Sequence, residues 1–127
     1  MTAFDAYIKP TVDQYLSNLS NALEDKKLGA RLQIMQSRGG LAGAGTARIR
    51  PVRLLLSGPS GGVKGALSEG KINNFKDLIT VDIGGTSCDI ALISDAKPLI
   101  RQEGVIDKYM DRVPMVHVKA NGSGGGS

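Results

Sequence analysis

Apolar side chains follow a helical period at the start of the chain. They recur at spacings of three and four residues, which places them on one face of a helix; the positions are Ile8, Val12, Leu16, Leu19 and Leu23. We expect an amphipathic helix over residues 6–27, with its firm part beginning near Lys9, because Pro10 fits only a first turn where no N–H is needed. A lysine pair and then Gly29 close the segment, as is typical of a helix C-terminus.

Short apolar runs and glycine-rich breaks alternate through the middle of the chain. Residues 31–36 alternate as a short strand does and stop before a glycine pair, and Gly43 and Gly45 predict a loose stretch after it. Residues 52–56 fit either a second strand or a buried approach to a turn. Helical spacing returns over residues 63–69.

From residue 78 onward the period is that of strands. Four apolar or alternating segments are bounded by turn-forming residues: 78–81, 89–93, 99–105 and 113–118. Residues 95–98 predict a hairpin turn. Helices first and antiparallel strands afterwards indicate an α/β fold, and a length of 127 residues favours one domain.

The most informative segment is VDIGGTSCDIALI, in which an apolar strand breaks into a glycine turn and resumes as a second strand. Its glycine and polar positions are Asp82, Gly84, Gly85, Thr86, Ser87 and Asp89. The two glycines let the backbone adopt positive φ and approach phosphate oxygens without an intervening Cβ. The hydroxyls can donate to an anion, and the two carboxylates can hold hydrated Mg²⁺ or orient water. The alternative is an ordinary hairpin with a Gly-Gly turn.

A second glycine-rich segment, SGPSGG, precedes the helical run at residues 63–69. Such a turn at a helix N-terminus exposes unpaired N–H groups and the positive end of the helix dipole, which suits an anion. Its candidate contacts are Gly58, Gly61 and Gly62. Helices also begin after Ser-Gly-Pro simply because serine caps and proline occupies the first turn. The spacing of a Walker loop is absent.

Three motifs together resemble one known family. DIGGTSCD is similar to the DxGGTxTD phosphate loop of the actin, sugar kinase and heat-shock chaperone superfamily. Within that superfamily, MQSRGG, RPVRLLLSGPSGGVKGA and ITVDIGGTSCDIALI resemble the hydantoinase A and 5-oxoprolinase family in order and spacing, from about Ala6 to Ser127. The resemblance implies a ribonuclease H-like (actin-like ATPase) lobe, present in part over residues 1–121, with residues 122–127 as a Gly/Ser-rich tail.

The resemblance also implies ATP-dependent chemistry on cyclic amides, with ATP and Mg²⁺ as cofactors. Members of the family open 5-oxoproline, hydantoins or related lactams, and relatives carboxylate ketones. The implied phosphate contacts are Gly84, Gly85, Thr86, Ser87, Gly58, Gly61 and Gly62. Asp82 and Asp89 are the implied catalytic carboxylates, which would hold Mg²⁺ or water.

Proteins of this superfamily clasp ATP between two lobes that each carry such a hairpin, and this sequence carries one. We therefore expect an internal fragment that needs the remaining lobes or a partner subunit, and that associates with itself through uncovered apolar surface. Three hypotheses stay open. The chain is a piece of a cyclic amide hydrolase that is inactive alone, a non-catalytic module that binds nucleotide or phosphate, or a structural subunit that assembles with a partner chain.

The tail GSGGGS has two interpretations. Its composition is typical of a flexible linker, and it also resembles the GAGGGS segment of the family, where it would be a second glycine loop near the nucleotide. The family usually has Asp near the position of His117 and an apolar residue at Asn121, so this sequence departs from the pattern at both.

Composition adds exclusions. The net charge of +4 comes from 16 basic and 12 acidic residues that are dispersed along the chain, so we expect no nucleic-acid binding. Cys88, the only cysteine, is interpreted as a small strand residue in preference to a reactive thiol, and His117 as a strand-surface histidine. The sequence shows no signal peptide and no bilayer-spanning segment, so we expect a cytoplasmic protein without membrane contact.

Overall fold

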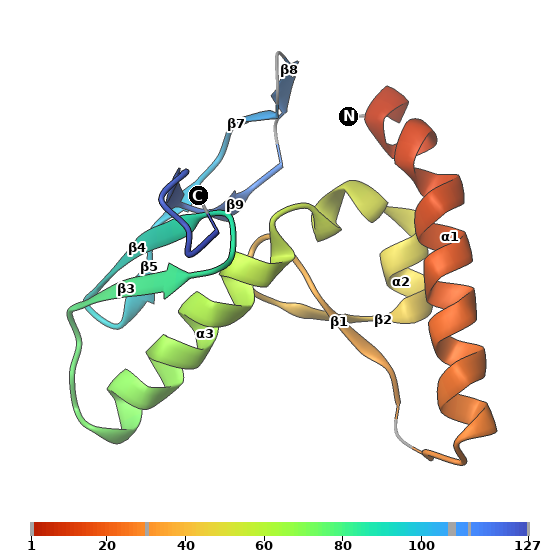
Figure 1. Ribbon diagram of the computed structural model, residues 1–127, viewed down its shortest axis with the longest axis horizontal. Helices are drawn as coiled ribbons and strands as arrows, with labels where there is room; N and C mark the ends of the chain where they lie inside the picture. Colours follow the sequence, from red (N-terminus) through yellow and green to blue (C-terminus); the bar gives the residue numbers. More distant parts are fainter. Residues whose placement is uncertain (1, 30, 107–108, 112, 127) are drawn as a thin grey trace.

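The computed structural model describes residues 2–29, 31–106, 109–111 and 113–126. Their helices are α1 (Thr2–Asp25), α2 (Ala44–Ile49), the 3₁₀ helix η1 (Pro51–Leu54) and α3 (Ser57–Ile72). Their strands are β1 (Gln33–Met35), β2 (Leu41–Gly43), β3 (Leu78–Ile83), β4 (Cys88–Ser94), β5 (Lys97–Pro98), β6 (Ile100–Arg101), β7 (Gly104–Ile106), β8 (Tyr109–Asp111), β9 (Met115–Val116) and β10 (Val118–Asn121). In Figure 1, α1 stands on one side of the molecule and the β3–β4 hairpin on the other, with α3 running along the hairpin. The mixed α/β organisation is confirmed.

A four-stranded antiparallel sheet carries the hairpin. Its strand order is β10-β4-β3, and β5 also pairs with β4. Successive side chains of a strand point to opposite faces of the sheet. Helix α3 covers one of these faces, toward which every second residue of each strand points. A first apolar cluster lies there and consists of Val63, Leu67, Ala91, Ile93 and Val116. The strands predicted at residues 78–81 and 89–93 are confirmed, and both are longer than predicted.

A second apolar cluster lies where η1 meets β9. It consists of Val52, Val113 and Met115, with Phe4, Ile8 and Leu55 packed against it. The run at residues 52–56 is thus a buried approach to α3 and not a strand. Pro51 starts η1, a position that suits its fixed φ and its missing N–H.

Helix α1 begins earlier than predicted and carries Pro10 in its interior. The helix predicted at residues 6–27 is confirmed, but its predicted start near Ala6, with the firm part beginning near Lys9, is too late. Pro10 cannot donate to the carbonyl four residues before it, but tertiary contacts hold the preceding turn. Phe4 and Ile8 pack against the second apolar cluster, and the Asp5 carboxylate accepts a hydrogen bond from Val52 N at 2.9 Å.

Other predicted segments change in extent. The stretch expected to be loose after residue 42 forms helix α2, whose Arg48 is tied to α1 by a bond from Lys9 Nζ to its carbonyl (2.6 Å) and by its own bond to Ser17 Oγ (3.1 Å). The predicted strand at 31–36 shortens to β1, while those at 99–105 and 113–118 each divide into two short strands. The turn predicted at 95–98 is confirmed between β4 and β5.

Two buried serines from the glycine-rich motifs connect the elements between the apolar clusters. Ser37 and Ser60 are each 1% exposed. Ser37 Oγ donates toward the carbonyl oxygens of Arg53 (2.7 Å) and Leu55 (2.5 Å). The Ser37 carbonyl accepts from Ser60 Oγ (2.5 Å) and from Val116 N (2.9 Å). The serines of MQSRGG and SGPSGG therefore fasten β1, η1, α3 and β9 to one another.

The segment SGPSGG is the first part of α3 and not a loop. Leu56 takes the N-cap position in a left-handed conformation (φ 54°, ψ 27°) without a side-chain cap. Pro59 is tolerated as the third helical residue because first-turn N–H groups have no intrahelical acceptor. The predicted glycine loop is wrong, and the helix predicted at 63–69 is confirmed within a longer one. Among the described helices, none is both long and apolar enough to cross a membrane.

Candidate functional site

The turn between β3 and β4 is closed by a hydrogen bond from Gly84 N to Ser87 O (2.9 Å). Positive φ among the described glycines occurs at Gly39 (φ 80°) and not in this turn, so the positive-φ role predicted for Gly84 and Gly85 is wrong. A Cβ added at Gly85 would meet nothing within 4 Å. The fold of the described residues therefore places no demand for glycine at this position.

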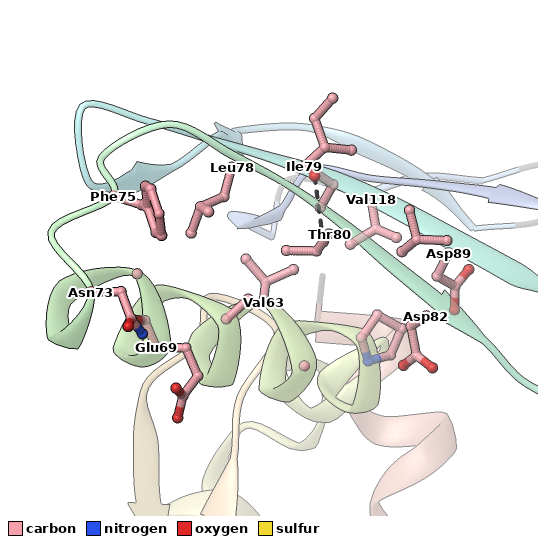
Figure 2. Close-up of a pocket in the computed structure, with 16 residues that line it drawn as sticks. Val63, Glu69, Asn73, Phe75, Leu78, Ile79, Thr80, Asp82, Asp89 and Val118 are labelled. Carbon is pink, nitrogen blue, oxygen red and sulfur yellow. Dashed lines mark hydrogen bonds between the residues drawn. The ribbon is translucent and has the colours of Figure 1, made fainter.

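Two carboxylates face each other at the foot of the turn. Asp82 of β3 and Asp89 of β4 are direct partners in the antiparallel register. Like charges directly opposite each other in a sheet are destabilising, so a cation between them would relieve a strain that the fold otherwise carries. Figure 2 shows both side chains at the same end of a groove between α3 and the hairpin.

This groove, which we call the α3–hairpin groove, has a volume of about 530 Å³. Gly62 of α3 forms its floor beneath Asp82, since a Cβ added there would lie 3.6 Å from Asp82 Oδ2. Gly61 faces elsewhere: an added Cβ would lie 3.9 Å from Met35 of β1. Gly58 does not line the groove. Of the predicted residues, the structure thus brings Asp82, Asp89 and Gly62 together in the groove. It leaves Gly58 and Gly61 outside it.

The opposite end of the groove is apolar and was missed by the sequence analysis. Leu78 and Phe75 line it above the helix, and Glu69 and Asn73 stand at its far rim (Figure 2). Thr80 lies midway, with its hydroxyl donating to the Ala91 carbonyl at 3.4 Å. The alternation of β3 residues gave a signal for this face, but the partner helix was not predictable from local sequence.

The glycine-rich tail lies against the turn. Gly125 N donates to Gly84 O (3.0 Å) and Gly126 N donates to Gly85 O (2.7 Å). The tail follows β10, whose last residue Asn121 pairs with Cys88 at the start of β4. The sequence analysis named the tail but did not predict this contact; residue 127 lies outside the described residues.

The chemistry of the donor set fits a hard, hydrated cation. Within the described part of the chain, no group of three or more His, Cys, Asp or Glu side chains could hold a metal ion. Mg²⁺ is typically held by one or two carboxylates, with waters and phosphate oxygens completing its shell. Cys88 is a half-buried strand residue and His117 is exposed, and neither lines the α3–hairpin groove.

A helix, a short turn and paired carboxylates lie around one groove of a mixed α/β protein, and comparison with known proteins gives the family. The sequence profile described as hydantoinase/oxoprolinase matches residues 1–127, so the chain belongs to that family. The family expected from the three motifs is confirmed.

Relatives with assigned names support the same membership. Caprolactamase subunit alpha of Pseudomonas jessenii is 32% identical over 126 residues, which are 99% of this chain and 18% of the relative. The 5-oxoprolinase of Saccharomyces cerevisiae is 34% identical over 125 residues, which are 97% of this chain and 9% of the relative. The nucleotide-free structure of acetone carboxylase, from a study of ATP-dependent acetone carboxylation, superposes with a TM-score of 0.78 and 32% identity.

The matched part of each relative is small. The superposition covers 86% of this chain but 15% of the acetone carboxylase chain. Several relatives are named as subunits, among them caprolactamase subunit alpha, the acetone carboxylase beta subunit of Xanthobacter autotrophicus and the acetophenone carboxylase gamma subunit of Aromatoleum aromaticum. The chain therefore corresponds to one segment of these longer proteins.

Proposed function

We propose that this chain is a ribonuclease H-like lobe whose β3–β4 hairpin forms one phosphate-binding side of an ATP site. The α3–hairpin groove supplies the floor of that site. The proposal extends the family membership to particular residues, namely Asp82, Asp89, Gly84, Gly85, Thr86, Ser87 and Gly62.

The observation that carries the proposal is the unrestrained space around Gly85. Its φ is not positive, and a side chain there would contact nothing within 4 Å. Glycine in a turn is usually explained by a positive φ or by a neighbouring atom that leaves no room for a side chain. Other glycines, Gly65 among them, share this open space, but Gly85 stands in the turn beside the Asp82–Asp89 pair, where a ligand would approach the backbone without meeting a side chain.

The two aspartates give the site its metal preference. A Mg²⁺ ion would be held by Asp82, Asp89 or both through direct or water-mediated contacts, and when bound it would neutralise charge on the phosphates. Asp82 lies over Gly62, the sixth residue of α3, where the lack of a side chain leaves room beside the carboxylate. These residues hold and orient phosphate groups beside an exposed hydroxyl of Thr86.

The reaction class follows from the family. We propose that the assembled protein uses ATP to activate the carbonyl oxygen of a small cyclic amide, or of a related carbonyl compound, for attack at the adjacent carbon. An amide resists hydrolysis because its carbonyl carbon is a poor electrophile, and phosphorylation of the oxygen removes that resistance. The part of this chain is to position the phosphates and to order water at the carboxylates.

The test replaces Gly85 by alanine and compares it with Gly65→Ala, a matched change in α3 where an added Cβ also meets nothing within 4 Å. Both substitutions should leave thermal stability unchanged or raised, because alanine reduces the entropy of the unfolded chain. Titration calorimetry with Mg-ATP should show affinity reduced about tenfold or more in Gly85→Ala alone. Equal affinity in both variants, or no binding by the parent chain, would overturn the proposal.

A second candidate is a nucleotide-binding module without catalysis, because the chain covers only 15% of the acetone carboxylase chain and carries one hairpin of the DxGGT type, β3–β4. One hairpin cannot enclose the γ-phosphate or exclude water. This candidate is favoured if the purified chain binds Mg-ATP but releases no phosphate with 5-oxoproline or hydantoin, even when the remaining part of a homologous protein is added. Restored turnover on that addition favours the enzyme fragment.

A further inference from the structure

The tail and the β3–β4 turn touch through backbone atoms. The two hydrogen bonds run from consecutive tail residues, Gly125 and Gly126, to consecutive turn residues, Gly84 and Gly85. Strand β10 delivers the tail to this place, since its pairing with β4 ends at Asn121, opposite the first residue of β4. In these bonds the partner numbers rise together along the tail and the turn, whereas they fall along the antiparallel pairing of β10 with β4, so the tail leaves that register after Asn121 and makes a separate backbone contact.

The approach of the tail to the turn is too close for a side chain at two positions. A Cβ added at Gly124 would lie 2.4 Å from the Thr86 carbonyl carbon, and one at Gly126 would lie 2.7 Å from Gly85 O. The other two tail glycines differ: nothing lies within 4 Å of an added Cβ at Gly122, and the nearest atom at Gly125 is 3.9 Å away. A flexible linker places no such position-specific demand on its residues.

The hydrogen bonds fix which way the peptide groups of the turn point. The described peptide bonds include no cis form, and in a trans peptide the C=O and the following N–H point in opposite directions. Because the carbonyls of Gly84 and Gly85 are bonded to the tail, the N–H groups of Gly85 and Thr86 are directed away from it. Two successive N–H groups on one side of a turn form a concavity that suits an anion.

We propose that residues 124–126 act as a brace that locks the β3–β4 turn in its phosphate-binding shape. The binding part of this inference rests on the proposed function, whereas the brace itself rests on the backbone contacts. Gly124 and Gly126 are positioning residues, because they act through the turn: Gly126 lies against the Gly85 carbonyl oxygen, and Gly124 lies against the Thr86–Ser87 peptide, where an added Cβ would be 2.6 Å from Ser87 N. Without the brace, the peptide groups of the turn are free to rotate, and only a fraction of molecules presents both N–H groups together.

The experiment compares four alanine variants in the full chain. Gly124→Ala and Gly126→Ala should move the amide NMR signals of residues 84–87 and remove the exchange protection of the Gly125 and Gly126 amides. Their affinity for Mg-ATP should fall about tenfold, as expected if the competent turn drops to about one tenth of the population. Gly122→Ala and Gly65→Ala, which lie outside the brace and have open space for a Cβ, should keep the parental signals and an affinity within about twofold of the parent.

The outcomes separate the brace from the proposed function. If all four variants keep the parental turn signals, or all four lose them equally, the brace is refuted. If the parent does not bind Mg-ATP, the proposed function fails and the turn and tail amide signals alone decide on the brace. If Gly124→Ala does not fold, Gly126→Ala serves in its place, because its clash involves a single carbonyl oxygen; amide signals of α3 report whether each variant is folded.

Discussion

At the scale of single residues, Asp82 and Asp89 place function and stability in opposition. Their direct pairing in the sheet costs folding free energy through like-charge repulsion, at about 0.2–1 kcal/mol for such a pair. A pair that holds a cation recovers this cost when the cation binds.

We predict that Asp89→Asn raises the free energy of unfolding by up to about 1 kcal/mol and lowers the affinity for Mg-ATP about tenfold. Thermal unfolding without metal and calorimetric titration with Mg-ATP measure the two changes. Asp95→Asn is the control, since Asp95 is an exposed carboxylate in the β4–β5 turn whose partner Lys97 lies 3.8 Å away. A variant in which stability falls together with affinity would show that Asp89 is needed for the fold itself.

Asp77 is a second carboxylate whose environment is specific. Its Oδ1 accepts hydrogen bonds from Asp95 N and Ser94 Oγ, both at 3.0 Å. These bonds, the backbone N–H of Asp95 first, lower the pKa of the Asp77 carboxyl. The ionised carboxylate thereby fastens the chain before β3 to the turn after β4.

A pH dependence follows from this lowered pKa. The contribution of Asp77 to stability is fully present above the pKa of the unfolded chain, about 3.9, and is lost as the pH falls through the lower folded value. We expect Asp77→Asn to unfold at a lower denaturant concentration than the parent at pH 7, and the difference between them to shrink below about pH 4. A difference that stays constant from pH 7 to pH 2.5 would contradict the role of the charge.

At the scale of elements, the buried hydroxyls of Ser37 and Ser60 connect elements that lie between the two apolar clusters. Ser37 Oγ donates toward two carbonyl oxygens, that of Arg53 in η1 and that of Leu55 after it. Ser60 Oγ donates to one carbonyl oxygen, that of Ser37, which also accepts from Val116 N. The two serines therefore differ in how much unpaired polarity their removal leaves.

We predict a graded loss of stability from this difference. Ser37→Ala should cost about 1–3 kcal/mol, because the Leu55 carbonyl loses the hydroxyl that donates to it, although the Arg53 carbonyl still accepts from Ser37 N; Ser60→Ala should cost about 0.5–1.5 kcal/mol, because the Ser37 carbonyl keeps its bond to Val116 N. Urea unfolding of both variants measures the costs, with Ser68→Ala on the exposed side of α3 as the control. Equal costs for Ser37→Ala and Ser60→Ala would argue against the network.

The elements whose pattern of apolar and polar residues lies within one short window could be predicted from the sequence. The apolar period of α1 and the strand–turn–strand pattern around Gly84 are contained within short windows, so their existence and type followed from sequence. The extension of α1 through Pro10 did not, because Val52 and the second apolar cluster, distant in sequence, hold that turn. The start of α3 was misplaced for the same reason: Ser60 is bonded to Ser37, 23 residues earlier.

The residues of the candidate site show the same difference between local and long-range determinants. Asp82 and Asp89 were predictable as a pair because both flank one turn. Gly62 was predicted as part of a loop, yet it reaches the site through the packing of α3 on the sheet. The contact of Gly124 and Gly126 with the turn depends on β10 ending beside the start of β4, which no local signal in the tail encodes.

At the scale of the whole molecule, one face of the sheet is apolar and uncovered. The side chains of β3 that point away from α3 are strongly exposed: Ile79 is 71%, Val81 57% and Ile83 65% exposed. Figure 2 shows Ile79 directed away from the helix. Among the described strands β3 also lies at the end of the sheet order, so one of its edges is open to pairing.

We predict that the isolated chain forms a dimer or larger assembly through this face and edge, with a second copy as the occupant. Pairing two β3 edges joins two sheets and covers the adjoining apolar side chains at the same time, which lowers the exposed apolar area of both copies. Light scattering should give a mass above the 13.3 kDa of the monomer, and the double variant Ile79→Lys, Ile83→Lys should return it to the monomer.

Ile49→Lys, at an equally exposed position of α2 (72%), is the control and should leave the assembly intact. A monodisperse parent of monomer mass at high concentration would show that the lobe tolerates this face in water, and that a strand from a partner chain is not needed to keep it folded.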